Sequence, residues 1–531
     1  MPTHPHKALL LCILLTAALL AAPLAVVADN IRSCPKKRIL VQGVGGDGFQ
    51  TAGILQYVED LKPGTNTQIG PKDFFEMASK KDSFDSLMEG FGDENGAADD
   101  PQLEEVLSGF EEESGTKASP SQEAQRQWPV QLDGYLKLGG RWNFAHDAPQ
   151  AGETDWRGLS GLRGEAQADL LIKWHRHWRM LIGGKVFYDS AYALRGRDGF
   201  TDAVIDAYES ESEWREIYLQ GRLGSHLDLK LGRQIVVWGR SDNLRVTDVL
   251  NPLDRREPGL TDIEDLRLPV AMSRFDGYLG SWNLTGIALH EIRFDKNPVF
   301  GHDFFPSSTP LPPEEMPTDA GDDTEWAAAL NGIFSGKDIS FYWANLFDET
   351  PHVTAGSDGG LVRRHARVTM WGAAGNLTMG NWLLKSEMAY WRGLKFFNTA
   401  GESHQRMDAL IGVEYGGWGE ASLSLEGAIR HLVDFDERLT QPPDFTQEDD
   451  ITYALRFTRD FANETVTLTL LALIYGPLGQ DGGLERISVQ YDWSDAVGIT
   501  MGVALYQSGD RYSMQRIGEN DRVFLEVKYS F

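Results

Sequence analysis

The sequence is poor in cysteine and in positive charge. Its 531 residues include two cysteines, Cys12 and Cys34. We expect Cys12 to be removed with an N-terminal targeting segment, which would leave Cys34 alone and unable to form an intramolecular disulfide. Lysine and arginine number 50 against 78 aspartate and glutamate residues, a formal net charge of −28. This balance argues against a nucleic-acid-binding protein, which needs a basic face to neutralise phosphates.

Long hydrophobic runs are also missing, except at the N-terminus. Residues 8–22 are almost entirely apolar, follow a weakly basic start and lead to compact residues that end at Ala28. This pattern predicts a signal peptide over residues 1–28. The alternative, a transmembrane anchor, is weaker because the run is short for a span of about 20 residues and is broken at Pro23. No later stretch is apolar for long enough to form a membrane helix, so the mature chain is either soluble or crosses the membrane as strands.

Residues 29–127 differ in composition from the rest, being rich in Asp, Glu, Ser and Gly and poor in strand formers. We interpret them as an acidic periplasmic extension, partly helical and partly disordered. A short repeat, residues 84–91 and 103–110, places apolar side chains at helical spacing before a Gly-Phe pair. The repeat predicts either two local helices that pack on nearby surface or a pair of docking motifs for a periplasmic partner. The candidate docking residues are Leu87, Phe91, Leu107 and Phe110.

From residue 128 onward, apolar residues recur at every second position. Leu136 and Leu138, for example, alternate with Tyr135 and Lys137. Such strands have one apolar face and one wetter face. In a soluble sandwich the apolar face would bury a core, whereas in a membrane barrel it faces lipid and the polar face lines the lumen.

The connections between the strands distinguish these two folds. We expect about 18 strands, within a range of about 14 to 18, and the links alternate between tight turns and long polar segments. A sandwich has no reason to make one end of its strands long-looped, but an outer-membrane barrel has short periplasmic turns and long external loops. The sequence therefore predicts an all-β protein, with a transmembrane antiparallel β-barrel over residues 128–531 in a Gram-negative outer membrane.

The C-terminal segment carries the most specific signal for this fold. Residues 522–531 alternate without a break and end at an aromatic residue. They resemble the C-terminal signature by which the outer-membrane barrel assembly machinery recognises its clients. This resemblance implies the assembly machinery and outer-membrane lipid as partners, with Val527, Tyr529 and Phe531 as the assembly signal.

Three motifs suggest other chemistry, and each has a simpler explanation. Residues 43–48 match G-x-G-x-x-G, but no second strand of a βαβ unit follows, so a Gly-rich turn is expected there. His175 and His177 lie at a tight turn without a third ligand, which favours interfacial residues over a metal site. His290 with Glu291 would suit a hydrolase, but no nucleophile can be placed beside them. We therefore expect no enzymatic activity, no cofactor and no metal.

The middle of the barrel region contains a characteristic set of motifs. G-R-Q at residues 232–234 runs to W-G at 238–239, and N-P-x-D follows at 251–254. Here the chain resembles an uncharacterised family of proteobacterial outer-membrane proteins, known only as a domain of unknown function and porin-like in character. The resemblance implies an outer-membrane barrel whose relatives are often linked to exporters of the RND class and to hydrophobic cargo. A periplasmic or RND-type exporter is therefore a candidate partner.

The long connection that contains these motifs is rich in both signs of charge. If it folds into the lumen, opposed rows of fixed charges would form a constriction that sets size and charge selectivity. If it caps the barrel outside, the same ion pairs would only stabilise the loop, and the sequence leaves both placements open. The candidate constriction residues are Arg240, Arg245, Asp248, Asp254, Arg255, Arg256 and Asp262.

These patterns predict an outer-membrane channel or transport barrel that passes small solutes or a hydrophobic cargo. A ring of about 18 strands leaves room for an aqueous lumen unless loops fill it. The alternative is a non-conducting barrel that anchors a periplasmic partner or exporter through the repeat in residues 84–110.

Overall fold

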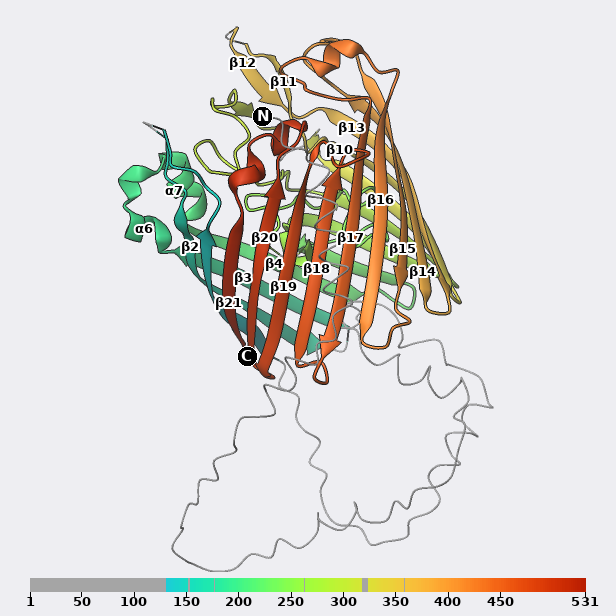
Figure 1. The fold of residues 1–531 in the computed structure, drawn as a ribbon. Helices are drawn as coiled ribbons and strands as arrows, with labels where there is room; N and C mark the ends of the chain where they lie inside the picture. Colours follow the sequence, from blue (N-terminus) through green and yellow to red (C-terminus); the bar gives the residue numbers. More distant parts are fainter. Residues whose placement is uncertain (1–129, 151–152, 176, 262, 318–322, 358) are drawn as a thin grey trace, which may run out of the picture. The chain divides into compact units, whose positions relative to one another are not determined.

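The computed structural model describes residues 130–531, apart from 151–152, 176, 262, 318–322 and 358. The expected signal peptide, the acidic extension and its docking residues Leu87, Phe91, Leu107 and Phe110 lie outside the described residues. Within the described part, eighteen strands form one antiparallel sheet (Figure 1). These wall strands are β1 (Val130–Asn143), β2 (Gly158–His175), β3 (Trp178–Asp189), β4 (Ser210–Arg222), β5 (Leu227–Gln234), β6 (Val270–Leu279), β7 (Trp282–Leu289), β9 (Glu325–Phe334), β10 (Lys337–Phe347), β13 (Arg367–Met379), β14 (Trp382–Leu394), β15 (His404–Tyr415), β16 (Ala421–Val433), β17 (Asp449–Phe461), β18 (Val466–Tyr475), β19 (Gly482–Ser494), β20 (Val497–Gln507) and β21 (Arg522–Ser530).

The sheet closes on itself. Each wall strand pairs with the next one, and β21 returns to pair with β1, with Tyr135 opposite Ser530 and Asn143 opposite Arg522. Closure bonds most backbone groups of the wall within the ring, apart from one edge of residues 210–216 in β4; a sheet in lipid requires such pairing because the hydrocarbon offers no hydrogen bonds. The prediction of a closed barrel with 18 strands is confirmed.

The wall has an apolar outer face and a charged inner face, and β14 illustrates both. Its outward-facing Leu384 and Met388 are 37% and 52% exposed, whereas the inward-facing Lys385 and Glu387 are 6% and 5% exposed. Apolar side chains outside and charged side chains inside are the reverse of the arrangement in a soluble protein and are typical of a barrel in lipid. The protein is an outer-membrane β-barrel, as the sequence predicted.

The two ends of the wall differ in the length of their connections. At the end where β21 stops, the links are tight turns, and Gly280 (φ 57°) and Gly380 (φ 60°) adopt the left-handed conformation that these turns need. At the other end the links are long, as expected from the sequence. Exposed tryptophans lie near both ends, in the manner of the aromatic belts at membrane–water interfaces. They include Trp142, Trp214 and Trp326 near the long links and Trp174, Trp382 and Trp493 near the turns.

The long links contain short helices and a small sheet. These are α6 (Ala191–Arg195), η1 (Arg197–Gly199), α7 (Asp202–Tyr208), η2 (Ile263–Leu266), η4 (Glu437–Thr440), η5 (Tyr512–Met514) and η6 (Ile517–Glu519), with β8 (Glu314–Glu315), β11 (His352–Ala355) and β12 (Leu361–Arg364). The hydroxyl of Thr201 accepts the backbone N–H of Val204 and so caps α7. The sequence had suggested only a polar connection there, because seven residues are too few for a clear helical period. No helix in the described part of the chain is both long and apolar enough to span a membrane.

Candidate functional site

The connection between β5 and β6, residues 235–269, enters the barrel. We call it the lumen segment. Its first residues bond to inward-facing side chains of β10, β14 and β16, and β14 and β16 stand across the ring from β5. In Figure 1 this green part of the chain is visible inside the ring of strands. Of the two placements that the sequence left open, the structure therefore shows the one inside the lumen.

Glu426 of β16 holds the beginning of the lumen segment. Its carboxylate is fully buried and accepts hydrogen bonds from the Ser241 hydroxyl (2.7 Å) and from the backbone N–H groups of Asp242 (3.0 Å), Asn243 (3.1 Å) and Leu244 (3.2 Å). Hydrogen bonds to an ionised oxygen are about twice as strong as neutral ones. One glutamate on the wall therefore fixes four consecutive residues of the segment.

Glu387 of β14 is a second anchor beside the first. Its carboxylate accepts the backbone N–H of Ser241 (2.8 Å) and both the N–H (3.0 Å) and the hydroxyl (2.7 Å) of Thr247. Gly239, the glycine of the W-G motif, lies against the same carboxylate with a φ of 87°, and a Cβ there would lie 2.6 Å from Oε1. The motif therefore needs glycine both for its backbone conformation and for this close approach.

Apolar side chains of the lumen segment pack on the inner wall next to these anchors. Val236, Trp238, Val246 and Leu250 are all buried in one cluster with inward-facing residues of β6, β7, β9, β10 and β13. The Trp238 ring lies 4.8 Å from the ring of Tyr342 on β10. The inner face is therefore not polar throughout, since part of it forms the core that holds the segment.

Asn251, the asparagine of the N-P-x-D motif, joins the two ends of the lumen segment. It is completely buried, and its Oδ1 accepts the backbone N–H of Val236 at 2.8 Å. Its Nδ2 donates to the carbonyl of Gln234 (3.2 Å), where β5 ends, and to that of Leu268 (2.9 Å), just before β6. The G-R-Q strand was expected to run on to W-G, but it stops at Gln234 because Asn251 takes up the next backbone groups.

Asn251→Asp is expected to destabilise the barrel by about 3 kcal/mol, because it sets a buried carboxylate against two carbonyl oxygens that lose their donor. Urea unfolding of the protein in detergent micelles measures the change. Asn297→Asp is the matched control, since Asn297 is exposed and makes only a long hydrogen bond of 3.4 Å. Equal unfolding free energies for the two variants would contradict this role of Asn251.

Glu257 attaches the other end of the lumen segment to the opposite part of the wall. Its carboxylate contacts Arg141 of β1 and lies 3.0 Å from Nη1 of Arg163 of β2. Burial alone would raise the pKa of Glu257, but the two guanidinium groups hold this pKa well below its usual range. The hydroxyl of Tyr506 on β20 donates to the neighbouring Pro258 carbonyl at 2.6 Å. The lumen segment therefore crosses the lumen, from β14 and β16 to β20, β1 and β2.

Asp303, in the connection between β7 and β8, forms another buried anchor. Its carboxylate is 0% exposed and lies 2.8 Å from Nη2 of Arg522 on β21, which is 2% exposed. Asn143 of β1 also donates to it, at 3.2 Å. Burial would raise the pKa of Asp303, but Arg522 holds this pKa far below its usual range, while burial lowers the pKa of the adjacent His302 to about 4. At neutral pH Asp303 is charged and His302 is neutral.

A small chamber remains between the lumen segment and strands β1 to β4. Its volume is about 80 Å³, which holds only a small cluster of water molecules, since one water occupies roughly 30 Å³ in the liquid. Acidic and basic side chains nearly balance in its lining, which suits water and small ions, and a larger solute requires the segment or its side chains to move. The charged lining residues are Lys137, Arg141, Arg163, Glu165, Lys185, Glu211, Glu213, Arg215, Asp254, Arg256, Glu257, Asp265 and Glu526.

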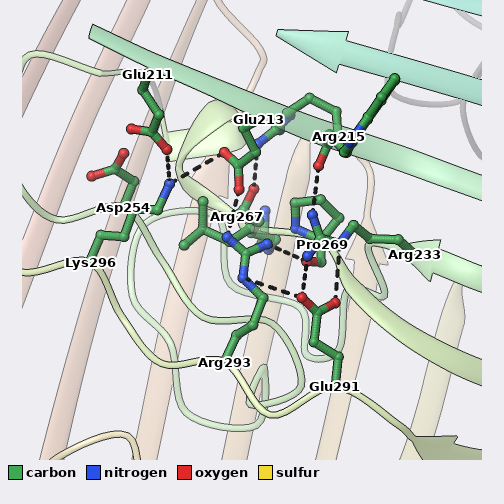
Figure 2. Close-up of polar contacts among 12 residues, drawn as sticks. Glu211, Glu213, Arg215, Arg233, Asp254, Arg267, Pro269, Glu291, Arg293 and Lys296 are labelled. Carbon is green, nitrogen blue, oxygen red and sulfur yellow. Dashed lines mark hydrogen bonds and ion pairs between the residues drawn. The ribbon is translucent and has the colours of Figure 1, made fainter. Parts of the chain in front are cut away.

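Two of these lining residues, Glu211 and Glu213 of β4, bond to the chain that follows β7 (Figure 2). Lys296 contacts Glu211 and lies 3.4 Å from Glu213, and Arg293 lies 2.6 Å from Glu213. The backbone N–H of Lys296 also donates to the Leu253 carbonyl of the lumen segment at 2.9 Å. Ion pairs therefore join β4 to residues 290–296, and main-chain bonds join those residues to the lumen segment.

The described candidates for a constriction have partners both inside and outside the lumen segment. Asp248 lies 3.1 Å from Arg245, and Asp254 lies 2.6 Å from Arg256. Arg255 pairs with Asp295 at 2.9 Å, and Arg240 donates to the hydroxyl of Ser340 on β10 at 2.8 Å. Asp262 lies outside the described residues. All of the candidate residues belong to the lumen segment, but a selective constriction at this place stays a prediction.

Sequence reasoning missed the wall residues to which the segment is attached. The most important of these are Glu387, Glu426, Arg141, Arg163 and Tyr506. Their signal in the sequence is a charged or polar residue at an inward position of an alternating strand. That signal marks a lumen-facing side chain, but it does not say which of many such side chains the segment contacts.

The structure also shows where the residues considered for barrel assembly, hydrolysis or metal binding lie. Val527 and Tyr529 of β21 are 39% and 47% exposed on the outer face, and their part in assembly stays a prediction. His290 Nε2 lies 2.8 Å from the hydroxyl of Ser273, but Glu291 bonds to Arg233 and to the backbone N–H of Ala271 instead of to the imidazole. Among the described residues, no group of His, Cys, Asp and Glu side chains is arranged to hold a metal ion.

Comparison with known proteins finds one family that matches this chain. Residues 123–531 match the model described as "Protein of unknown function (DUF1302)". No curated protein matches the chain.

Solved structures give distant likenesses. The chain is similar to OccAB1 of Acinetobacter baumannii, with 10% identity, a TM-score of 0.45 and coverage of 76% of this chain and 96% of the other. It is similar to the outer membrane protein OpdK of Pseudomonas aeruginosa, with 11% identity, a TM-score of 0.44 and coverage of 76% and 98%. For the loop L8 deletion mutant of OmpT, an outer membrane protein of Vibrio cholerae, the identity is 10%, the TM-score 0.36 and the coverage 76% and 99%.

Proposed function

Since this chain belongs to the family of proteins of unknown function DUF1302, over residues 123–531, we propose that it is an outer-membrane channel whose passage is limited by the lumen segment. The observation that carries this proposal is the attachment of one segment to opposite parts of the wall, through Glu426 and Glu387 on one side and Glu257 on the other. A connection held in this way divides the lumen and leaves narrow, charge-lined paths, which is how barrels set size and charge selectivity.

The cargo that fits these paths is small and polar. Fixed charges of both signs line the chamber, so they attract ions and polar solutes without strongly preferring one sign. Carboxylates and guanidinium groups this close to one another also keep the chamber wet. We therefore propose small hydrophilic solutes and ions as the cargo of the central path.

Single-channel recording of the purified full chain in planar lipid bilayers tests this function. We expect discrete conductance steps that are smaller than those of a barrel of this size without an inner segment. A difference in gel mobility between heated and unheated samples shows that the barrel is folded. Folded protein without conductance steps would contradict a channel and favour the non-conducting anchor.

A further inference from the structure

The wall is not bonded equally on both sides of β4. All of β4, from Ser210 opposite Tyr188 to Gly221 opposite Trp178, runs beside β3. Its other edge pairs with β5 only from Ile217 to Arg222. Residues 210–216 have no strand partner on that edge within the described part of the chain, because the chain turns into the lumen after β5. We call this edge the β4 seam.

Side chains close the β4 seam where a strand would otherwise lie. The Trp214 carbonyl accepts Nη1 of Arg233 at 2.9 Å, and Arg233 in turn donates from Nε to Glu291 at 3.1 Å. Higher up, Glu213 and Glu211 reach across to Arg293 and Lys296 (Figure 2). The side chains of these ion pairs are 14–24% exposed, and they take the place of the backbone hydrogen bonds that join the other wall strands. The seam is therefore held by contacts that can break without disturbing the rest of the sheet.

A bulge bends β4 at the place where the seam begins. The pairing of β3 with β4 shifts register between Ile182 and Gly184, which face Ile217 and Trp214. Arg215 and Glu216 of β4 lie opposite the single residue Gly183 of β3, so β4 carries one extra residue. A β-bulge bends its strand and increases the local twist. The upper half of β4 therefore diverges from β5 at Ile217, the last residue that pairs with β5.

The β4 seam lies near the outer edge of the apolar band of the membrane. β5 has eight residues, so it is about 26 Å long and, at a tilt of about 40°, covers about 20 Å of height. The apolar band of such barrels is about 25 Å tall. Trp214, beside the seam, is 62% exposed on the outer face and suits the membrane–water interface. Lipid therefore reaches the seam from outside.

The chamber lies directly behind the seam. Glu211, Glu213 and Arg215 of β4 line it, together with Leu260 and Leu268 of the lumen segment. The same glutamates thus close the seam and face the chamber. A molecule that separates these ion pairs can pass from the lipid into the charged chamber, and the distance it crosses is the thickness of one strand.

We propose that the β4 seam is a lateral opening, through which an amphiphile with a charged head group and one apolar chain passes between the outer leaflet and the lumen. The proposal rests on the proposed channel function. The charged chamber solvates the head group, while the apolar chain remains at the lipid-facing edge beside Trp214. The path through the charged chamber offers no comparable apolar surface to such a chain, since fixed charges line the chamber.

A cleavable cross-link across the seam tests the proposal. In the full chain with Cys34→Ser, Glu213→Cys and Arg293→Cys are joined by a bis-maleimide that contains a disulfide. A fluorescent lysophospholipid is added outside proteoliposomes, and its arrival at albumin trapped inside is followed. We expect the protein to speed transfer at least about fivefold over protein-free vesicles, the cross-link to abolish this gain, and reduction to restore it. Glu211→Gln with Glu213→Gln, which weakens the closure, should speed transfer further.

The control places the same cross-link between fully paired strands. His431→Cys and Asp449→Cys replace a contact of 2.8 Å between β16 and β17, and this cross-link should leave transfer unchanged. Transfer that persists across a closed seam, or a wild-type rate equal to that of protein-free vesicles, overturns the lateral opening. Conductance steps in planar bilayers are recorded in parallel. If conductance steps persist but lateral transfer does not occur, the lateral opening is wrong and the channel function stands. If the protein without a cross-link shows no conductance steps, the channel function itself is wrong.

Discussion

Replacing Glu387 and Glu426 together with glutamine is expected to raise single-channel conductance at least about twofold. The two carboxylates accept most of the hydrogen bonds that hold residues 240–247 on the wall, from backbone N–H groups and from the Ser241 and Thr247 hydroxyls. Glutamine offers one acceptor oxygen and turns an NH2 group toward donors, so several buried N–H groups lose their partners at about 1–3 kcal/mol each. The segment then detaches at this end and widens the path. Recording in planar bilayers measures the change.

The matched control removes two other carboxylate charges that also face the lumen. Glu165 and Glu526 line the chamber, and Glu165 pairs with Lys137 and Lys185 of the wall instead of with the lumen segment, so Glu165→Gln with Glu526→Gln should change conductance much less. Both double variants must show the mobility shift of a folded barrel. If the control raises conductance as much as Glu387→Gln with Glu426→Gln, charge and not the position of the segment governs the path.

The wall could be predicted from the sequence because its signals are local. The alternation in residues 522–531, the tight turns and the long links each depend on neighbouring positions, and together they predict a closed ring. Two departures come from long-range contacts. β5 stops at Gln234 because Asn251, 17 residues later, bonds to its carbonyl. The apolar patch around Trp238 faces inward because the lumen segment covers it, which an alternation pattern does not reveal.

The site could be predicted only in part, for the same reason. The charges of the lumen segment were recognised, but the wall residues that hold the segment are separated from it by up to 248 residues along the chain. Any inward-facing carboxylate on eighteen strands was an equal candidate. Asp248 and Asp254 pair with arginines of the same segment, whereas Arg255 and Arg256 also reach Asp295 and Glu211 outside it, so the opposed rows of charge stay a prediction.

These contacts also explain why the motifs of the family lie so close together. Gly239 leaves room for Glu387, and Asn251 closes the segment on the end of β5. Gln234 is fully buried and donates to the Met272 carbonyl of β6 at 3.2 Å. Each motif residue shapes the path of the chain into the lumen, and none of them is placed to act on a solute directly.

Asp303→Asn is expected to lower the free energy of unfolding by about 3–5 kcal/mol, because it leaves the buried guanidinium of Arg522 without a counter-charge. Arg522 lies on the last strand of the barrel and is held at 2% exposure with its guanidinium over the ring of Phe304, 4.4 Å from its centre. An unpaired charge there cannot reach water without opening the contact between β21 and the connection that bears Asp303. Urea unfolding in detergent micelles measures the loss.

The second change, Arg522→Met, separates a charge effect from a packing effect. If the cost of Asp303→Asn comes from the unpaired cation, adding Arg522→Met should restore most of the lost stability, since the pair is then replaced by neutral groups. Asp436→Asn provides a control for removing an aspartate that bonds to arginine, because the Asp436–Arg438 pair lies in a surface link and should contribute nothing measurable. A double variant less stable than Asp303→Asn alone would show that Arg522 stabilises β21 through its packing on Phe304, and that Asp303 acts mainly by orienting it.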